Sequence, residues 1–443
     1  MKIQLSEHFT YKKLFRFTLP SICMMIFMSI YGMVDGFFVS NFVDERAFVS
    51  VNFIMPVLML IGAIAFMLGT GGSALVAKTL GEGDKEKANS LFSLFVYTAI
   101  VIGVVLGIIS ILCIRPIAAL LGASREMMGY CLPYARIVLA VLPFTMLQYA
   151  FHSFFATAEK PGFGFIVTVV AGCTNMLLDA LFIIVFHWGV KGAAAATAIS
   201  QFVGGLIPLV YFAVSKKNSI RLGKAKIDIP ALVKASGNGM SEFLSNVAMS
   251  VVGMLYNAQL LRYAGENGIA AYGVLMYVGF LFFSVFIGYC TGTAPIVSYH
   301  YGAKNEEELK SLLHKSLRII IVSSVAMVVL SQALAYPLSL VFVGYNPTLV
   351  ALTRRAFFFY SFLFAFAGVS ILGSSFFTAL NNGLVSAAIA FLRVAFFQIV
   401  AVLVFPLIWG TDGIWLSVVF SDFAAMVTAI VCFIANRKKY NYW

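Results

Sequence analysis

The sequence predicts an all-α integral membrane protein with twelve transmembrane helices in two pseudo-symmetric six-helix bundles. Three observations support this prediction: the apolar composition, the long uncharged segments, and a repeat of the first half of the chain in the second. Of the 443 residues, 61% are hydrophobic and 11% are charged, and the mean hydropathy is +0.96. Soluble domains carry about 25% charged residues, so lipid is the expected surrounding of this chain.

Segments long enough for a transmembrane helix, which needs about 20 apolar residues, recur along the whole sequence. Eight of them contain no Asp, Glu, Lys or Arg: 47–77, 88–114, 137–158, 192–215, 243–261, 267–303, 319–353 and 356–392. With the segments around Asp35, Asp179, Arg393 and Asp422, twelve helices are expected to begin near residues 14, 49, 90, 132, 163, 192, 235, 269, 315, 352, 384 and 412. In these segments apolar and polar residues do not alternate as they do along the strands of a membrane β-barrel.

The positive charges predict the orientation. With the N-terminus inside, 21 of the 30 Lys and Arg residues fall in segments expected in the cytoplasm and seven in segments expected outside. This asymmetry is typical of proteins inserted by the positive-inside rule. We therefore expect a multi-pass protein of the cytoplasmic (inner) membrane with both termini in the cytoplasm. The net charge of +12 reflects this orientation, and nothing else in the sequence indicates nucleic-acid binding. The first apolar segment is too long for a cleavable signal peptide.

The chain repeats itself at an offset of 221 residues. The segment TGGSALVAKTLGEGDKEKANSL (70–91) aligns without a gap with TGTAPIVSYHYGAKNEEELKSL (291–312). Pro116 with Pro337 and Gly192 with Gly413 keep this offset, whereas the Phe pairs at 154–155 and 376–377 need one insertion. The repeat divides the chain into an N-lobe (1–214, helices 1–6), a cytoplasmic linker (215–234) and a C-lobe (235–443, helices 7–12). Six helices is an even number, so both lobes share one orientation, which is typical of transporters with parallel repeats around a site near the membrane centre.

Polar residues interrupt the apolar segments of the N-lobe. Asn175 and Asp179 stand four residues apart, so they share one face of helix 5. From the helical rise, Asp179 lies about 12 Å below the outer end of its helix, and Asp35 and Thr197 each lie about 8 Å below theirs. Tyr31 lies one turn deeper than Asp35 on the same face. A carboxylate in hydrocarbon costs at least about 2.5–3.5 kcal/mol, so this set of oxygen atoms indicates a site for a shared proton or a small cation such as Na⁺.

The alternative is that these polar groups only bind one another and hold the helices together. The repeat argues against it, because Asp35 corresponds to a position near Asn257, Asp179 to a position near Ala401, and Thr197 to Val418. The second lobe keeps the scaffold without the acids, so the architecture alone does not require them.

The C-lobe has ionisable residues of its own. From the helical rise, Glu242, Arg393 and Asp422 lie about 10, 14 and 20 Å above the cytoplasmic ends of their helices. Arg393 could pair with either acid. We expect a structural pair with Asp422 across the last hairpin, because an unpaired buried charge is costly. Glu242 would then face the central cavity and attract cations, with Met28 and Asn257 as further candidates for its wall, since Met adapts to varied ligands.

Several motifs together resemble the multidrug and toxic compound extrusion (MATE) family. They are LGTGGSALVAKTLGEGDKEKA (68–88), KGAAAATAISQ (191–201), NGMSEFL (238–244) and the division after helix 6, and the similarity is strongest to the MepA-like branch. In that family the residues matching Asp35, Asn175, Asp179 and Thr197 form the N-lobe proton or cation site. The resemblance implies a secondary active multidrug efflux antiporter. It would export amphiphilic organic cations in exchange for H⁺ or Na⁺ by alternating access, as a monomer without a cofactor.

The sequence disfavours two other function classes. A lipid-linked oligosaccharide flippase of the same superfamily should have a basic cavity for pyrophosphate, whereas this cavity is expected to be acidic. An intramembrane enzyme should show paired GxGD aspartates, HExxH, or a nucleophile beside a base, and the sequence contains none of these. The six Cys residues show no metal or redox spacing. His152, the one histidine expected deep in the membrane, is interpreted as a core residue rather than a proton relay.

Overall fold

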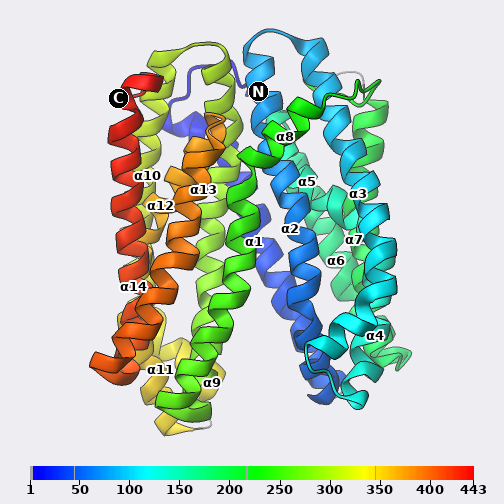
Figure 1. The fold of residues 1–443 in the computed structure, drawn as a ribbon, viewed down its shortest axis with the longest axis vertical. Coiled ribbons are helices and arrows are strands. Elements are labelled where there is room, and N and C mark those ends of the chain that lie inside the picture. Colours follow the sequence, from blue (N-terminus) through cyan, green and yellow to red (C-terminus); the bar gives the residue numbers. More distant parts are fainter. Residues whose placement is uncertain (1–2, 44, 216–217, 345) are drawn as a thin grey trace.

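The computed structural model describes residues 3–43, 45–215, 218–344 and 346–443, and the regular secondary structure in these ranges is helical. The first lobe contains α1 (Tyr11–Phe42), α2 (Glu45–Gly81), α3 (Lys85–Leu120), α4 (Arg125–Ala140), α5 (Leu142–Thr157), α6 (Pro161–Asp179), η1 (Ala180–Val185) and α7 (Gly189–Val214). The second contains α8 (Ile229–Asn238), α9 (Met240–Gly302), α10 (Glu306–Val343), α11 (Pro347–Tyr360), α12 (Leu363–Ala379), α13 (Gly383–Phe391), η2 (Leu392–Phe397) and α14 (Gln398–Tyr440). The two lobes stand side by side, and both termini lie at the same end of the bundle (Figure 1).

Two of these helices fold back at a sharp turn and contribute to two membrane spans each, the first span of α14 beginning with α13 and η2. α9 has 63 residues, which would extend about 95 Å if straight and so cross the hydrocarbon layer three times over. It folds back at Gly265 (φ 63°), and α14 folds back at Gly410 (φ 58°). Both φ values lie in the left-handed region that suits glycine. In the repeat Gly410 corresponds to Gly189, whose φ is 56°.

Two predicted spans are bent rather than continuous. The span expected from residue 132 consists of α4 and α5, which meet at 64°, and the span expected from residue 352 consists of α11 and α12, which meet at 47°. Pro143, at the start of α5, has no N–H to donate, so the helical hydrogen bonds are interrupted there. With these pairs and the two hairpins, the spans of the described residues make two bundles of six helices.

The beginning of the second lobe differs from the sequence-based boundary. α8 starts at Ile229, inside the predicted linker 215–234, because the Asp228 side chain accepts a hydrogen bond from Ala231 N–H at 2.9 Å and caps the helix. α8 lies against α2 of the first lobe: a Cβ atom at Gly71 of α2 would lie 1.9 Å from the Ala235 carbonyl oxygen of α8. Residues 216–217 of the linker lie outside the described residues.

At the end that carries the termini, the lobes meet through a symmetric pair of glycines. A Cβ atom at Gly81 would lie 2.0 Å from the carbonyl oxygen of Tyr299, and one at Gly302 would lie 2.0 Å from that of Lys78. Because Gly81 with Gly302 and Lys78 with Tyr299 are both related by the offset of 221, this contact follows the internal symmetry of the chain. It joins the end of α2 directly to the end of α9.

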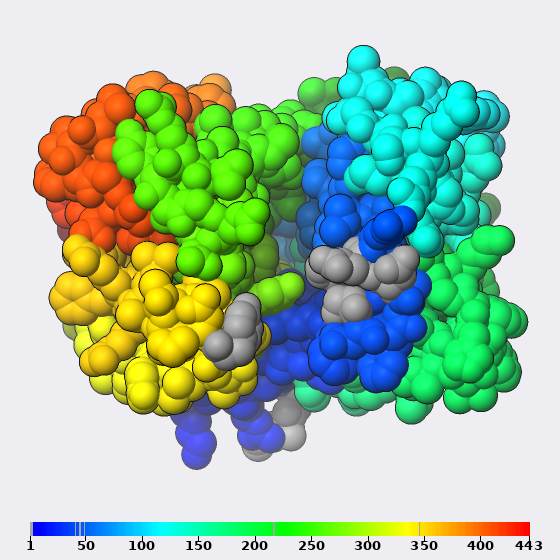
Figure 2. Space-filling view, turned by 90° about the horizontal axis from the view of Figure 1, so that it is seen from below, coloured from blue at the N-terminus to red at the C-terminus, as the bar shows by residue number. Residues whose placement is uncertain are grey.

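At the opposite end the lobes diverge. The ribbons separate toward the lower end of Figure 1, and the view onto that end in Figure 2 shows two masses with a recess between them. α1 links the lobes, because Leu14 and Phe17 near its start are buried in the core of the second lobe, whereas Met24 and Val39 further along are buried in the core of the first. The structure is therefore closed at the termini-bearing end and open at the other.

Candidate functional site

The predicted N-lobe site begins with the close packing of α1 on α6. A Cβ atom at Gly172 would lie 2.5 Å from Phe27 Cε1 and 3.0 Å from Tyr31 Cδ1, so only glycine allows this approach. Phe27, Tyr31 and Asp35 follow at four-residue intervals on α1. Asn175 and Asp179 follow Gly172 on the facing side of α6. Gly172 thus allows a row of side chains on α1 to meet a row on α6. The first row ends in Asp35 and the second in Asp179.

The two carboxyl groups lie close to each other within this packing. The Asp35 side chain lies within reach of both the Asp179 carboxyl and the Asn175 amide. Asp179 is 0% exposed and Asn175 is 2% exposed, whereas Asp35 is half-buried. No Lys or Arg of the described residues forms an ion pair with either acid. A proton or cation that neutralises Asp35 and Asp179 must therefore come from outside the protein.

Two further helices complete the cluster. Thr197 on α7 lies beside Tyr134 on α4, and the phenol of Tyr134 is close to both carboxylates. Tyr134 is 1% exposed and was not singled out from the sequence. The phenol of Tyr31 lies near Asp35. α1, α4, α6 and α7 therefore each contribute polar atoms to one buried place.

The oxygen atoms of this cluster are not satisfied by protein hydrogen bonds of good geometry. Among the described residues, buried oxygens without a hydrogen-bond partner include Asp35 Oδ1, Asn175 Oδ1, both carboxyl oxygens of Asp179 and Thr197 Oγ1. Each unsatisfied buried group costs about 1–3 kcal/mol, and more if it is charged. Two carboxylates with neutral amide and hydroxyl oxygens suit a monovalent cation or a proton shared between the acids.

The backbone changes directly after Asp179. α6 ends at this residue, and residues Ala180–Val185 continue as the π-helix η1. The fifth span of the second lobe also contains a π-helical segment, η2 (Leu392–Phe397), which includes Arg393. Single π-helical turns inside α-helices are frequent at functional sites. Both lobes therefore break the regular helix beside their buried ionisable residues.

In the second lobe, Arg393 and Asp422 come together. Arg393 Nε donates to Asp422 Oδ1 at 2.7 Å, and the guanidinium lies 5.4 Å from the ring centre of Phe283. The Asp422 side chain is 1% exposed. Glu242, half-buried in α9, interacts with Arg393 only through longer-range electrostatics. Of the two partners that the sequence left open for Arg393, Asp422 is the one in contact.

The other candidates are more dispersed. Met28 is half-buried on α1 and Asn257 is exposed on α9. Ala401 and Val418, the counterparts of Asp179 and Thr197, are buried apolar residues 1% and 7% exposed. His152 is buried in α5, and neither ring nitrogen has a hydrogen-bond partner among the described residues. The C-lobe positions equivalent to Asp179 and Thr197 are thus apolar, and the position near that equivalent to Asp35 carries the neutral amide of Asn257.

Comparison with known proteins decides the family. The MatE family model matches residues 20–181 and, a second time, residues 243–404. The chain belongs to the MATE family. The two matches are equal in length and fall on the two halves of the repeat. The chain is a MATE transporter of the MepA-like branch and not an enzyme.

Its relatives among curated and solved MATE proteins cover most of the chain. The multidrug export protein MepA of Staphylococcus haemolyticus is 28% identical over 321 residues, which are 72% of this chain and 69% of the relative. MepA of Staphylococcus aureus is 23% identical over 432 residues, 97% of this chain and 94% of the relative. A solved outward-facing multidrug resistance MATE transporter matches with a TM-score of 0.91 at 23% identity, covering 98% of this chain and 97% of the other. A MOP superfamily transporter from Pyrococcus furiosus matches with a TM-score of 0.88 at 22% identity, covering the same shares. These likenesses confirm the predicted fold of two six-helix bundles.

Proposed function

We propose that this MATE protein is a secondary active antiporter that exports amphiphilic organic cations in exchange for H⁺ or Na⁺. The observation that carries the proposal is the proximity of Asp35 to Asp179, two acids inside the bundle with no basic partner among the described residues. The names of its relatives, multidrug export proteins, support the same activity.

The acids would couple ion movement to drug movement. Two carboxylates in contact in a low dielectric repel each other when both are charged, so binding of a proton or Na⁺ relieves that repulsion. Coupling requires the ion to bind one conformation of the protein more tightly than the other. The cluster spans α1, α4, α6 and α7, so a shift of any of these helices alters the distances between its oxygen atoms. Asn175, Thr197, Tyr31 and Tyr134 would supply neutral ligands or hydrogen bonds.

The orientation follows from the charges. We place the termini-bearing end on the cytoplasmic side of the inner membrane. Most Lys and Arg residues lie in segments that the sequence-based topology assigns to this end. The lobes, which meet at this end and diverge at the other, are then open to the outside. A driving ion would enter from that side and drug would leave by it.

The cavity between the lobes would favour cations. Arg393 is held by Asp422, so the charge of Glu242 has no direct ion pair of its own in the described residues. Met28 and the exposed Asn257 would add adaptable and polar contacts at its wall. Each chain contains both lobes and its own acids, so a monomer is sufficient for transport.

Reconstitution tests the proposal and separates the two ions. Purified protein in sealed vesicles, loaded with ethidium on the cytoplasmic side, should move the dye when an inward gradient of either protons or Na⁺ is imposed. Collapse of the effective gradient with a proton or sodium ionophore should stop movement and so identify the ion. Dye movement that ignores both gradients would contradict antiport.

A further inference from the structure

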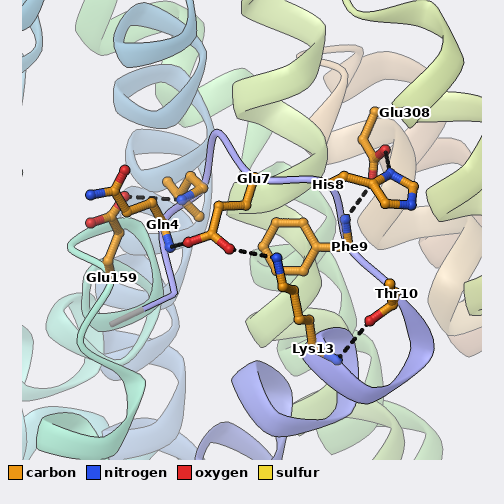
Figure 3. A network of polar contacts seen from close by, with 9 residues as sticks. Gln4, Glu7, His8, Phe9, Thr10, Lys13, Glu159 and Glu308 are labelled. Carbon is orange, nitrogen blue, oxygen red and sulfur yellow. Dashed lines mark hydrogen bonds and ion pairs between the residues drawn. The ribbon is translucent and has the colours of Figure 1, made fainter. Parts of the chain in front are cut away.

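Residues 3–10 form a non-helical segment with a turn at residues 5–7, here called the N-terminal strap, that crosses the termini-bearing ends of both lobes (Figure 3). Leu5 and Phe9 are 1% and 0% exposed and belong to one buried cluster, which also includes Ala156 of α5. The Phe9 ring packs edge-on against Phe17 of α1, with 5.9 Å between ring centres. The side chains of Leu5 and Phe9 therefore hold the strap to the protein, whereas Gln4, Ser6, His8 and Thr10 are exposed.

One anchor of the strap is Glu159, in the turn between α5 and α6 of the first lobe. Its Oε1 accepts a hydrogen bond from the Leu5 N–H at 2.9 Å. Its Oε2 accepts one from Ser219 Oγ, in the segment that joins the lobes, at 2.8 Å. A single carboxylate thus ties the strap and the interlobe linker to the N-lobe.

The second anchor is Glu308, in the first turn of α10 of the second lobe, whose side chain is 6% exposed. Its Oε1 accepts from the Phe9 N–H at 2.9 Å, and its Oε2 lies 2.5 Å from His8 Nδ1. Lys315, further along α10, donates from Nζ to the Phe9 carbonyl oxygen at 2.6 Å. Hydrogen bonds to charged groups contribute about 1.5–3 kcal/mol each, so this end is held firmly.

Between the anchors the strap is folded on itself. Glu7 accepts from the Gln4 N–H at 3.0 Å and from Lys13 Nζ at 2.7 Å. The hydrogen bond from Lys13, followed by that from Gln4, lowers the pKa of the half-buried Glu7 carboxyl. These local contacts keep the segment between Leu5 and Phe9 shorter than its fully extended length.

The internal repeat shows that the scaffold does not require the two anchoring acids. The offset of 221 puts Lys87 at the position of Glu308, and the inserted residue puts Asn381 at the position of Glu159. Glu159 and Asn381 share a left-handed backbone, with φ of 58° and 57°. The turn is thus common to both lobes, whereas the carboxylate occurs only where the strap passes.

We infer that the N-terminal strap is a conformational latch that holds the termini-bearing ends of the two lobes together. Four Cα–Cα steps separate Leu5 from Phe9, so the chain between the anchors can extend at most about 14 Å. Separation of the lobes beyond that reach requires release of Glu159 or Glu308. The latch therefore stabilises the conformation that is closed at the termini-bearing end. Opening this end requires the free energy that breaks the strap's contacts. The inference rests on the proposed alternating access, but its test concerns the resting protein without drug or ion gradient.

The test is a distance between the lobes measured by pulsed spin-label spectroscopy. Labels at Lys85 of α3 and Lys310 of α10, both exposed, report the separation of the two ends in a variant whose six cysteines are replaced. With the strap intact one short distance should dominate. The double variant Glu159→Ala with Glu308→Ala should raise the ratio of long to short distances about tenfold or more. Glu307→Ala, which removes an exposed acid next to Glu308, should leave the distribution unchanged.

A second variant avoids disturbing the buried contacts. Inserting Gly-Ser-Gly between Ser6 and Glu7 keeps both anchors but lengthens the tether by about 10 Å, so it should also raise the population of long distances. Distributions in both variants that match the Glu307→Ala control would overturn the latch. Antiport that fails in vesicles while these distances shift would count against the proposed function and leave the latch standing.

Discussion

Gly81 at the end of α2 and Gly302 at the end of α9 each lie against the backbone of the other's helix. The two contacts are related by the internal repeat. A Cβ atom built on either glycine would lie 2.0 Å from a carbonyl oxygen of the other helix. At this point the lobes are joined backbone to backbone, with no side chain between them. The closed end of the transporter is therefore built on a symmetric contact, and the strap crosses the same end.

Adding a methyl group to that contact should open it. Gly81→Ala and Gly302→Ala should each raise the share of long distances between labels at Lys85 and Lys310 by a similar factor, because overpacking costs about 1–3 kcal/mol. Gly162→Ala is the control, since a Cβ there meets nothing within 4 Å. Unequal effects of the two variants would contradict the symmetric role.

The topology can be checked with reporter fusions. A fusion after Lys224, between α7 and α8, and a fusion after Trp443 should both report the cytoplasm, because an even number of spans precedes each. A fusion at Gly265, in the hairpin of α9, should report the outside. An outside signal from either of the first two would rule out the proposed orientation.

The buried pair of the second lobe should be structural. Arg393→Leu should reduce the yield of folded protein strongly, because it leaves the Asp422 charge buried without a partner, at a cost of about 3–5 kcal/mol. Asp422→Leu in addition should restore most of the yield. Arg355→Leu, which breaks the exposed pair with Asp412, is the matched control and should cost at most about 1 kcal/mol. A double variant no better than Arg393→Leu would reject the pairing.

Tyr134 should assist the two acids. Tyr134→Phe removes the hydroxyl beside Thr197, and Thr197→Ala and Asn175→Ala each remove one neutral oxygen. Each change should slow ethidium export about two- to tenfold at unchanged protein level, because one hydrogen bond contributes about 0.5–1.5 kcal/mol. Tyr277→Phe, at an exposed and stacked tyrosine, should have no effect. Full activity of the Tyr134 variant would remove it from the site.

The sequence was informative where polar residues interrupt apolar segments. Asp35, Asp179 and Arg393 stand out in segments that are otherwise uncharged, and the helical rise predicts which of them share a depth. Tyr134 could not be recognised in this way, because the chain has 19 Tyr residues and one more in a helix carries no signal. The position of Tyr134 depends on how α4 packs on α7. The break between α4 and α5 at residue 141 likewise depends on tertiary packing.

The strap was hidden for a different reason. Glu159 lies in a connecting turn and Glu308 in the first turn of a helix, where acids are common and usually solvated, and His8 looks like part of an ordinary tail. Only the fold shows that Leu5 and Phe9 are buried between these acids. The spans, the repeat and the buried acids thus follow from local pattern, whereas the contacts between lobes depend on long-range packing.

The central claim is that Asp35 and Asp179 couple ion entry to drug export. Ethidium accumulation in intact cells expressing the Asp179→Asn variant tests it most directly, with folded protein verified by size-exclusion chromatography and Glu307→Gln as the exposed-acid control. We expect Asp179→Asn, like Asp35→Asn, to accumulate dye as cells without the transporter do, while the control exports normally. Wild-type export by well-folded Asp179→Asn protein would contradict the account and leave these residues as contacts between helices.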